Sequence, residues 1–409
     1  MRILIYSYNY YPELIGIAPL MTELAEGMVK RGHEVRVLTA MPWYPEGEIH
    51  PSYKGKFFTT EDIRGVIVQR SYIWTSKKRN LFSRIGFEFS FVFFSLIQAL
   101  KGWRPDVILL TVPGLPVCIP AALLGNLYDS PVVLNLQDIL PDAAVQVGLI
   151  NNEKLIKILK NLEKFAYRAA TKISVIADGF TKNIAAKGVA LEKIVEIPNW
   201  VDINFIRPMP RENNYFRREN NLEDKFVILY SGNIALTQGL ETVIEAAALV
   251  QHIPDIAVVI VGEQKALARL QEYCDRCGAK NVRLLPFQPR EKLPEMLAAA
   301  DVGLVVQKKN VLDFNMPSKI QVLLASGRAI IASVPATGTA ASAINKSGGG
   351  IVTPPEDPHA LAAAIEDLYN YREKTIALGN KGRAYAESNY AFEIALDKYE
   401  QLFASVVRA

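Results

Sequence analysis

The chain has 409 residues, and half of them are apolar. It is too long for one ordinary hydrophobic core, so two α/β domains are expected. A formal net charge of +4 is too small for a dedicated nucleic-acid binder, although clustered basic residues would suit an anionic ligand or a membrane surface. The chain opens directly with a strand-like run, and its three cysteines fit a reducing compartment, so a protein without a signal peptide is expected.

The first half of the chain reads as alternating buried strands and helices that begin with a βαβ unit. The runs 2–7 and 34–39 predict strands, joined by a helix through Met21 and Met28. The loop after the first strand carries Gly16 but no Gly-x-Gly-x-x-Gly fingerprint, which argues against a dehydrogenase. The later elements of this half are predicted as strands at 106–111, 131–136, 172–176 and 194–197 and a helix over 152–170.

Two acidic residues follow the predicted strand at 131–136. Asp138 and Asp142 lie at its carboxyl end, where α/β proteins place ligand contacts. For either aspartate, a ligand contact and a loop-capping role are equal alternatives at this stage.

The segment 70–104 has the largest local charge bias of the chain. Its phenylalanine-rich apolar run is interrupted by charged residues, so it makes a poor transmembrane span. A basic, aromatic helix of this kind can lie on an anionic membrane or pack on the sheet with a solvated basic end, and the sequence favours neither. The basic residues that carry the bias include Lys77, Lys78, Arg79, Arg84, Lys101 and Arg104.

The pattern starts again after a polar, proline-bearing linker that begins near residue 206. A buried strand at 226–230 leads into a loop with Gly232, Asn233 and Gln238, and the strand at 256–261 ends near Glu263. Further strands are predicted at 282–285, 302–306, 329–333 and 350–352.

The stretch 313–331 carries the strongest candidate for an anion site. Pro317 is expected in the first turn of a helix that Gly327 ends, so Ser318 and Lys319 would lie at the helix N-terminus, outside the carboxyl end of a strand. Free N–H groups, the helix dipole and the lysine charge all favour an anion there.

With these residues placed, the chain resembles the GT-B glycosyltransferases of family 4, the retaining class that uses nucleotide sugars. Within that family it is similar to the colanic-acid and N-acetylfucosamine-transferase-like members that build surface polysaccharides. The resemblance covers nearly the whole chain and rests on Tyr11-Pro12-Glu13 with Gly16, Arg31-Gly32-His33-Glu34-Val35, Gln137-Asp138-Ile139-Leu140-Pro141, Ile197-Pro198-Asn199-Trp200-Val201-Asp202, Ser231-Gly232-Asn233 with Gln238-Gly239, and Pro317-Ser318-Lys319 with Ala325-Ser326-Gly327.

The resemblance implies an α/β GT-B fold with two Rossmann-like doubly wound domains facing a central cleft. Residues 1–205 would form the acceptor-binding domain and residues 206–389 the nucleotide-sugar-binding domain. A C-terminal helix at about 390–409 would pack back on the first domain.

The chain departs from the family pattern at several functional positions. Phe314 and Val322 occupy the places of two glutamates, and Asn233 and Gln238 those of an arginine and a lysine. The catalytic histidine of the first domain has no counterpart among His33, His50, His252 and His359.

These departures shift the expected catalytic roles to other residues. Lys319 would neutralise the donor diphosphate, with Lys308 as a second candidate, and Asp138 would be the nearest polar substitute for the histidine. The other residues expected at the donor site are Gly16, Gly232, Asn233, Gln238, Glu263, Pro317 and Ser318.

The function implied by the resemblance is transfer of a sugar from a nucleotide-diphosphate sugar to a lipid-linked saccharide acceptor. We expect a hexosyltransferase without a metal or other cofactor, because no Asp-x-Asp or comparable ligand spacing is present. The protein would be cytoplasmic, peripheral on the inner face of the plasma membrane through Lys77, Lys78, Arg79 and Arg84, with no nucleic-acid partner. A nucleotide-sugar 2-epimerase of the same fold and a non-catalytic scaffold remain alternatives.

Overall fold

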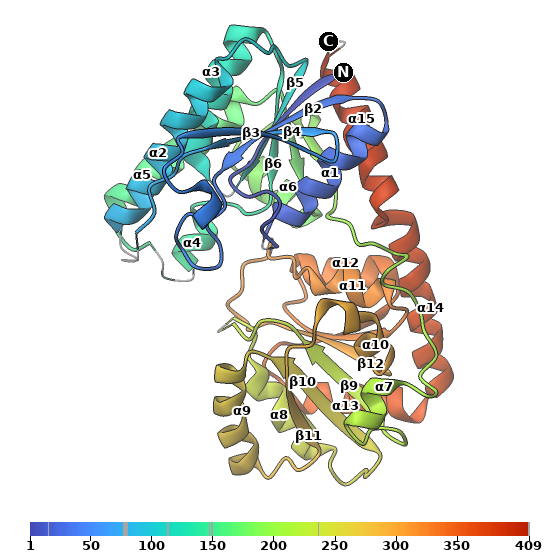
Figure 1. Ribbon diagram of the computed structural model, residues 1–409. Helices are drawn as coiled ribbons and strands as arrows, with labels where there is room; N and C mark the ends of the chain where they lie inside the picture. Colours follow the sequence, from blue (N-terminus) through green and yellow to red (C-terminus); the bar gives the residue numbers. More distant parts are fainter. Residues whose placement is uncertain are drawn as a thin grey trace. The chain divides into compact units, whose positions relative to one another are not determined.

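The computed structural model describes residues 1–14, 16–76, 81–112, 114–146, 148, 150–235 and 237–407. The chain divides into two compact units, coloured from blue to red along the sequence in Figure 1. Unit 1 contains residues 1–198 and 396–409, and unit 2 contains residues 199–395.

Unit 1 is built on an eight-stranded sheet with the order β3-β4-β2-β1-β5-β6-β7-β8. All neighbouring strands are parallel except β3 and β4, which form an antiparallel hairpin at one edge. The central strands are buried along nearly their whole length, as expected for a sheet covered on both faces. The strands are β1 (Arg2–Tyr6), β2 (Glu34–Ala40), β3 (Phe58–Ile63), β4 (Val66–Ser71), β5 (Val107–Val112), β6 (Val132–Leu136), β7 (Lys172–Val175) and β8 (Ile194–Glu196).

The β3–β4 hairpin was not predicted from the sequence. Its turn places Arg64 at φ 54° and Gly65 at φ 84°, both in the left-handed region. β3 is an edge strand whose residues are only half-buried or exposed, so it lacks the apolar run by which the other strands of unit 1 are recognised.

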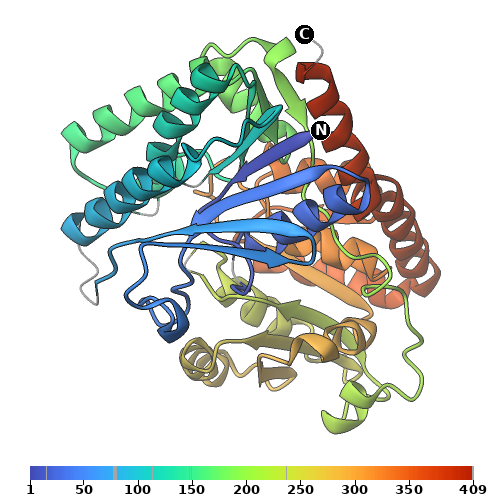
Figure 2. The same ribbon diagram turned by 45° about the horizontal axis from the view of Figure 1, so that its top comes forward.

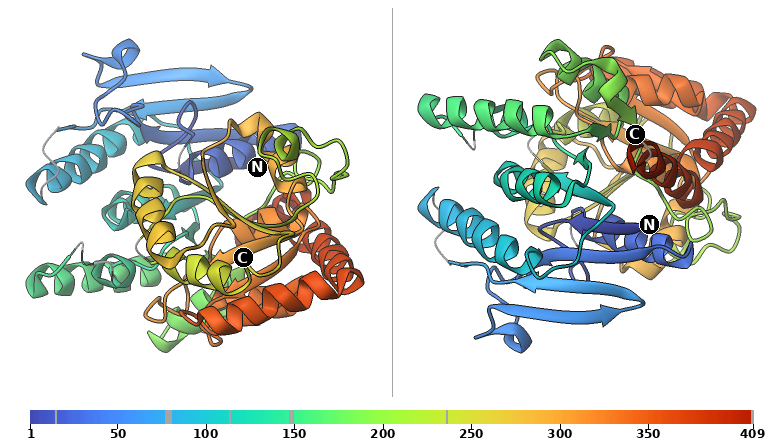
Figure 3. Two further views of the ribbon diagram at one scale, coloured as in Figure 1. Left: turned by 90° about the horizontal axis from the view of Figure 1, so that it is seen from below. Right: turned by 90° about the horizontal axis from the view of Figure 1, so that it is seen from above.

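The helices of unit 1 lie on both faces of its sheet. β2 and β5 flank β1 on opposite sides, so right-handed connections place α1 and α3 on opposite faces. α3 packs against both α2 and α5, and Figures 2 and 3 show these three helices side by side. The helices are α1 (Ala18–Lys30), α2 (Leu81–Ala99), α3 (Cys118–Tyr128), α4 (Asp142–Gln146), α5 (Glu153–Ala169) and α6 (Asp178–Ala186).

The last helix, α15 (Phe392–Val407), ends within unit 1. Arg31 forms ion pairs with Glu400 at 2.7 Å and Asp397 at 2.6 Å, and the His33 ring contacts the Glu400 carboxylate at 2.9 Å. Arg31 and His33 therefore hold the C-terminal helix, which gives both residues a structural role.

Unit 2 contains a six-stranded, wholly parallel sheet with the order β11-β10-β9-β12-β13-β14. Apolar side chains form a separate core on each of its faces. The strands are β9 (Phe226–Ser231), β10 (Ile256–Gly262), β11 (Val282–Pro286), β12 (Val302–Val306), β13 (Ala329–Ser333) and β14 (Gly350–Thr353). The helices are α7 (Tyr215–Glu219), α8 (Leu240–Leu249), α9 (Gln264–Cys277), α10 (Leu293–Ala298), α11 (Lys319–Ala325), α12 (Thr339–Ser347), α13 (Pro358–Asn370) and α14 (Arg372–Asn389).

Candidate functional site

The loop after β9 carries a glycine beside a lysine that is remote in sequence. Gly232 has φ 140°, and a Cβ added to it would lie 3.3 Å from Nζ of Lys319. The Gly232 N–H donates to the carbonyl oxygen of Val261 at 3.1 Å. The glycine thus leaves room for the lysine head group, while its own N–H is already used to fix the loop.

Lys319 is a half-buried amine with an aromatic ring as its close neighbour. Its Nζ lies 3.8 Å from the ring centroid of Tyr230. Desolvation lowers the pKa of Lys319 from 10.5 to about 7. No carboxylate forms an ion pair with it in the described part of the chain. An anion close to this amine would favour its protonated form, so the anion would be paired with a full positive charge.

Two residues that the sequence analysis missed hold this loop in place. The Tyr230 hydroxyl donates to the carbonyl oxygen of Asn233 at 2.8 Å. A Cβ on Gly262 would lie only 2.4 Å from Cδ1 of Ile234, so a larger residue at the end of β10 would displace the loop. Tyr230 was read only as part of a buried strand, because nothing in the local sequence indicates that its ring lies beneath Lys319.

A second lysine lies where the same loop ends. Gly239, at φ 63°, immediately precedes α8, and a Cβ there would lie 3.2 Å from Cγ of Lys308. The Lys308 N–H donates to the Thr237 carbonyl at 2.8 Å. The amide oxygen of Gln238 is buried without a hydrogen-bond partner among the described residues. Lys308 and Gln238 therefore belong to the loop surroundings, whereas the Asn233 side chain is exposed.

Ser318 and Lys319 do lie at a helix start, but the helix differs from the prediction. α11 begins at Lys319 with Ser318 as its N-cap, so Pro317 precedes the helix instead of forming its first turn. The Pro317 carbonyl accepts from the Ile320 N–H at 3.1 Å, a tighter turn before the regular helix. α11 has only seven residues, so the Lys319 charge matters more here than the helix dipole.

The positions of the missing family glutamates are part of the core of unit 2. Phe314 is 6% exposed, and Val322 packs against the apolar cluster beneath α11. Glu263 lies elsewhere, as the exposed N-cap residue of α9, without a capping hydrogen bond from its side chain. Its carboxylate is the acidic group nearest in sequence to the end of β10.

In unit 1, the loop after β1 is held by buried charged groups. Glu13 is 6% exposed and accepts hydrogen bonds from the Trp43 and Tyr44 N–H groups, each at 3.0 Å, and from Asn9. Buried Arg70 donates to the Glu61 carboxylate at 3.0 Å. Gly16 has φ 57° with open space at its Cβ position. Glu13 was quoted only as a motif residue, and its buried bonds explain why the motif needs a carboxylate.

Asp138 and Asp142 separate clearly in the structure. Asp142 forms an ion pair with Lys187 at 2.7 Å, and Lys187 also contacts buried Glu163 at 2.6 Å, which is a structural role. Asp138 is exposed, and neither a hydrogen bond nor an ion pair occupies its carboxylate within the described residues. Although the residue is exposed, neighbouring protein atoms partly desolvate its carboxylate and raise its pKa above the ordinary aspartate value. Of the two, Asp138 is the one available to a ligand.

The loop that carries Asp138 starts from a buried hydrogen-bond network. Gln137 donates to the Asn135 side-chain oxygen at 2.9 Å. The Asn135 amide donates to Ser174 at 3.0 Å and to the Tyr399 hydroxyl at 2.9 Å. This network joins β6, β7 and α15 and fixes the backbone from which Asp138 projects.

The predicted basic residues of the membrane side are only partly described. Lys77, Lys78 and Arg79 lie outside the described residues. Arg84, on α2, is exposed and pairs with Glu88 at 2.6 Å. No helix in the described part of the chain is long and apolar enough to span a bilayer. Those same residues contain no cluster of three or more His, Cys, Asp or Glu side chains that could bind a metal ion.

Taken chemically, the carboxyl edge of the unit 2 sheet offers one anion-responsive amine on a tightly held glycine loop. Burial lowers the pKa of this lysine to about 7, and its protonated form can stabilise negative charge that arrives with a ligand or develops on a leaving group. Asp138 in unit 1 offers a carboxylate that no described residue pairs with.

Sequence comparison identifies two family domains in the chain. Residues 16–200 match a glycosyl transferase 4-like domain, and residues 212–385 match the glycosyl transferases group 1. WcaI of Escherichia coli, named as a glycosyl transferase of colanic acid biosynthesis, is 33% identical over 98% of both chains. WbjE of Pseudomonas aeruginosa, named as a glycosyltransferase, is 27% identical over 76% of this chain and 74% of its own.

Among solved structures, HepE of Anabaena in complex with UDP superposes with a TM-score of 0.74 at 17% identity. The match covers 99% of this chain and all of HepE. A complex of HepE with UDP-glucose gives a TM-score of 0.71. The chain therefore belongs to the group 1 glycosyltransferases of GT-B fold. The expectation of two Rossmann-like domains is confirmed.

Proposed function

We propose that this glycosyltransferase is a retaining, family 4 enzyme that transfers a sugar from a nucleotide-diphosphate sugar to a lipid-linked saccharide in surface polysaccharide synthesis. The observation that carries the donor part of this proposal is the contact of Lys319 with Gly232 and Tyr230. A diphosphate is the leaving group of such a donor, and this amine becomes fully charged when an anion lies against it.

The chemistry asked of the protein is mainly positioning and charge stabilisation. As the bond to the transferred sugar breaks, negative charge grows on the departing diphosphate. The protonated amine of Lys319 would offset this charge. Ser318, exposed at the start of α11, would add a hydroxyl donor next to the amine. HepE binds UDP and UDP-glucose on the same fold, which supports a nucleotide sugar as the donor here.

Asp138 would act on the acceptor side of the reaction. Its exposed carboxylate has no partner in the described part of the chain, and the Asn135 network fixes its loop. A carboxylate at that place can accept a hydrogen bond from a sugar hydroxyl and orient it for attack. Retention would show as an unchanged anomeric configuration in the product, which proton NMR of the first-formed product measures directly.

The apolar face of α2 supports a membrane-bound acceptor. Phe82, Ile85, Phe89, Phe93 and Ile97 recur at helical spacing, and all are exposed, Phe82 to 73% and Phe89 to 70%. Such a stripe on a helix that is too interrupted to span a bilayer fits burial at the headgroup boundary.

The neighbouring helices extend this face. On α3, Ile119, Leu123 and Leu127 are exposed at successive turns, and α5 exposes Ile158 and Phe165. α5 also carries exposed basic residues, which anionic lipids would attract at about 1 kcal/mol each. These are Lys154, Lys157, Lys160, Lys164 and Arg168. We therefore place the lipid contact on α2, α3 and α5 together, on the cytoplasmic leaflet.

One assay tests the proposed function against its alternatives. The purified protein is incubated with a panel of nucleotide sugars, with and without a membrane extract that contains polyprenyl-diphosphate saccharides. Sugar incorporation into lipid that needs both components is the expected result. Acceptor-independent conversion of the donor sugar would identify an epimerase, and nucleotide binding without turnover would identify a scaffold.

We further propose that the transfer is metal-independent, because Lys319 supplies charge that a divalent ion would otherwise provide. Activity should therefore survive dialysis against a chelator. Loss of activity that magnesium or manganese restores would contradict this part of the proposal.

A further inference from the structure

Unit 2 contains a second polar site, at the opposite edge of its sheet from Lys319. A cavity of about 870 Å³ is lined by residues that precede the strands. Asp255, Asp301 and Arg328 immediately precede β10, β12 and β13, and Phe226 is the first residue of β9. In a parallel sheet the amino ends of all strands lie at one edge, so this cavity and the glycine loop are at opposite ends of the same sheet.

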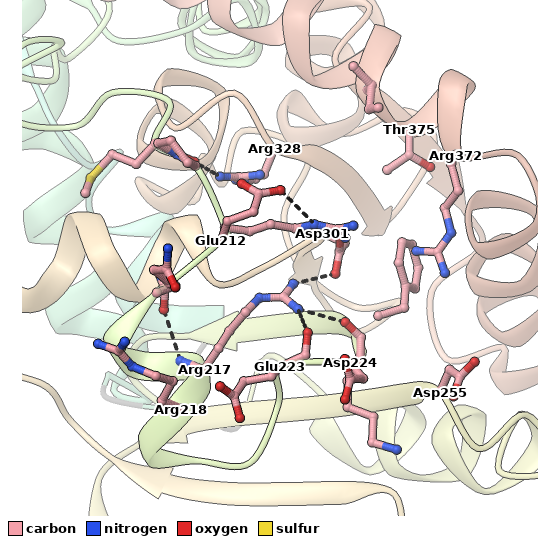
Figure 4. A pocket seen from close by; sticks show the side chains of 18 residues that line it. Glu212, Arg217, Arg218, Glu223, Asp224, Asp255, Asp301, Arg328, Arg372 and Thr375 are labelled. Atoms are coloured by element: carbon pink, nitrogen blue, oxygen red, sulfur yellow. Dashed lines mark hydrogen bonds and ion pairs between the residues drawn. The ribbon is translucent and has the colours of Figure 1, made fainter.

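Two guanidinium groups donate to the Asp301 carboxylate in this cavity. Arg328 and the carboxylate of Glu212 also line it, as Figure 4 shows. Arg211 and Arg217 each donate to Asp301 at 2.8 Å, and the Val227 N–H donates to the same carboxylate at 2.8 Å. Arg328 donates to the carbonyl of Met209 at 2.6 Å, without an ion pair to any described carboxylate. Arg211 also lies 3.9 Å from the Glu212 carboxylate, and the whole lining carries six basic and five acidic side chains, a small excess of positive charge.

Two of these arginines have buried N–H groups without an acceptor among the described residues. Arg217 is 2% exposed, and neither its Nε nor the buried Nε of Arg328 finds a hydrogen-bond acceptor in that part of the chain. An unsatisfied buried donor on a charged group is costly, so an acceptor in the cavity would be stabilising. Burial lowers the pKa of Arg328, and the neighbouring Arg217 and Arg211 lower it further, whereas Asp301 and Glu212 raise it. A bound anion would add to the effect of these two carboxylates.

Arg372, from α14, also lines the cavity. The guanidinium carbon of Arg372 lies 3.9 Å from the ring centroid of Phe226 and 4.4 Å from that of Tyr369. It stacks on these rings without an ion pair to a described carboxylate. Figure 4 shows it apart from the Asp301 cluster, so a ligand that reached both would need to be larger than a single anion.

We propose that this cavity binds a small phosphorylated metabolite, of the sugar-phosphate class, as a site separate from the donor site. A phosphate group offers several acceptor oxygens to guanidinium groups, which recognise it bidentately. The volume is within the range of small-molecule sites and leaves room for a sugar ring beside the phosphate. The segment from Met209 to Asn214 forms one wall, so the ligand would fix the strap that leads from unit 1 into β9.

The test is calorimetric titration of the full-length protein with glucose 6-phosphate, inorganic phosphate and glucose. We expect saturable binding of glucose 6-phosphate, weaker binding of phosphate and none of glucose. The Lys319→Ala variant, which alters the donor site, should bind glucose 6-phosphate as the wild type does. Arg328→Gln should weaken binding about tenfold or more, the scale of one lost charged hydrogen bond.

Arg372→Gln provides a second variant, because Arg372 is exposed and forms no ion pair with a described carboxylate. It should weaken glucose 6-phosphate more than inorganic phosphate. Arg276→Gln is its matched control, since Arg276 is also exposed and lies over an aromatic ring, Tyr273, outside the cavity. The proposal is overturned if the wild type shows no saturable binding, if Lys319→Ala abolishes binding, or if folded Arg328→Gln and Arg372→Gln bind as tightly as Arg276→Gln.

Discussion

The two units are built on the same doubly wound plan but present different surfaces. Large apolar side chains are exposed over much of unit 1, on α2, α3, α5 and the loops after β1 and β2. In unit 2, the exposed large apolar residues of the described chain are few and scattered. They are Tyr215, Leu249, Phe287, Tyr371 and Ile376. Single exposed apolar residues are ordinary, whereas a continuous set over three neighbouring helices indicates a contact surface.

Candidate anion sites, in contrast, lie in unit 2. Unit 2 holds Lys319 on its glycine loop and the arginine cavity at the other edge of its sheet. The buried charges of unit 1 that surround its loops, such as Glu13 and Glu163, are fully used in internal bonds. This difference supports the proposals of anion sites in unit 2 and of an apolar contact surface in unit 1.

The largest expected effect is on the anion site of unit 2. Lys319→Ala should reduce turnover about a hundredfold, the scale of one lost transition-state donor. Steady-state kinetics with the identified donor measure it. Lys309→Ala is the control, because Lys309 is an exposed lysine that follows the neighbouring Lys308. Equal activities of the two variants would remove Lys319 from the catalytic site.

The next effect concerns the basic helix of unit 1. Lys157→Glu combined with Lys164→Glu should weaken binding to anionic vesicles at least about thirtyfold, because loss of the two positive charges alone costs roughly 1 kcal/mol each near the surface and the new carboxylates are repelled as well. Co-sedimentation at low and high salt measures it. Lys265→Glu with Lys280→Glu makes the same charge change on exposed residues of unit 2 and should leave binding unchanged. Lys77→Glu/Lys78→Glu/Arg79→Glu should also weaken binding.

If both double variants lose vesicle binding equally, net charge alone explains it, and the distinction between the units fails for lipids. If neither loses it, α5 is not part of the lipid contact.

The third effect is the pH dependence of donor binding. The pKa of Lys319 is about 7 in the free protein, and a bound diphosphate should raise it, so binding takes up a proton above pH 7. Affinity should be highest below pH 7 and fall about tenfold per pH unit above it. Calorimetry with a nucleotide sugar is suitable, since its diphosphate does not titrate in this range. Lys319→Arg stays charged and should flatten the profile; an unchanged profile would contradict the assignment.

Much of the fold could be predicted because buried parallel strands appear as continuous apolar runs. The strands of unit 2 fall within a residue or two of their expected positions. The β3–β4 hairpin was missed because an edge strand with half-exposed residues lacks that run. Pro317 was placed inside α11 because proline is favoured in a first helical turn, but here a tight turn precedes the helix.

Only those parts of the candidate site that depend on local sequence motifs could be predicted. Lys319 and Gly232 were chosen separately, from a helix start and a strand end, and their contact follows from two adjacent strands, β9 and β12. Tyr230 beneath the amine, the arginine cavity and the exposed face of α3 and α5 depend on contacts between distant segments. The composition of the segment 70–104 indicated a basic, aromatic helix, which is α2, whereas α5 was predicted only as a helix without a contact surface.

The smallest expected effects separate surface function from folding. Phe89→Ser removes a 70% exposed ring that stacks on Phe93 with centroids 6.3 Å apart. Because the ring is already in water, the free energy of unfolding should change by only about 0.5 kcal/mol. If the ring inserts into lipid, its loss costs about 1.5–3 kcal/mol of membrane binding, at least tenfold in vesicle affinity. Ile376→Ser, at an exposed apolar position of unit 2, should change neither quantity. Urea unfolding measures the free energy of unfolding of both variants, and vesicle titration measures their membrane affinity. A Phe89→Ser protein that is clearly destabilised yet binds vesicles normally would show that the exposed apolar residues of α2 serve packing.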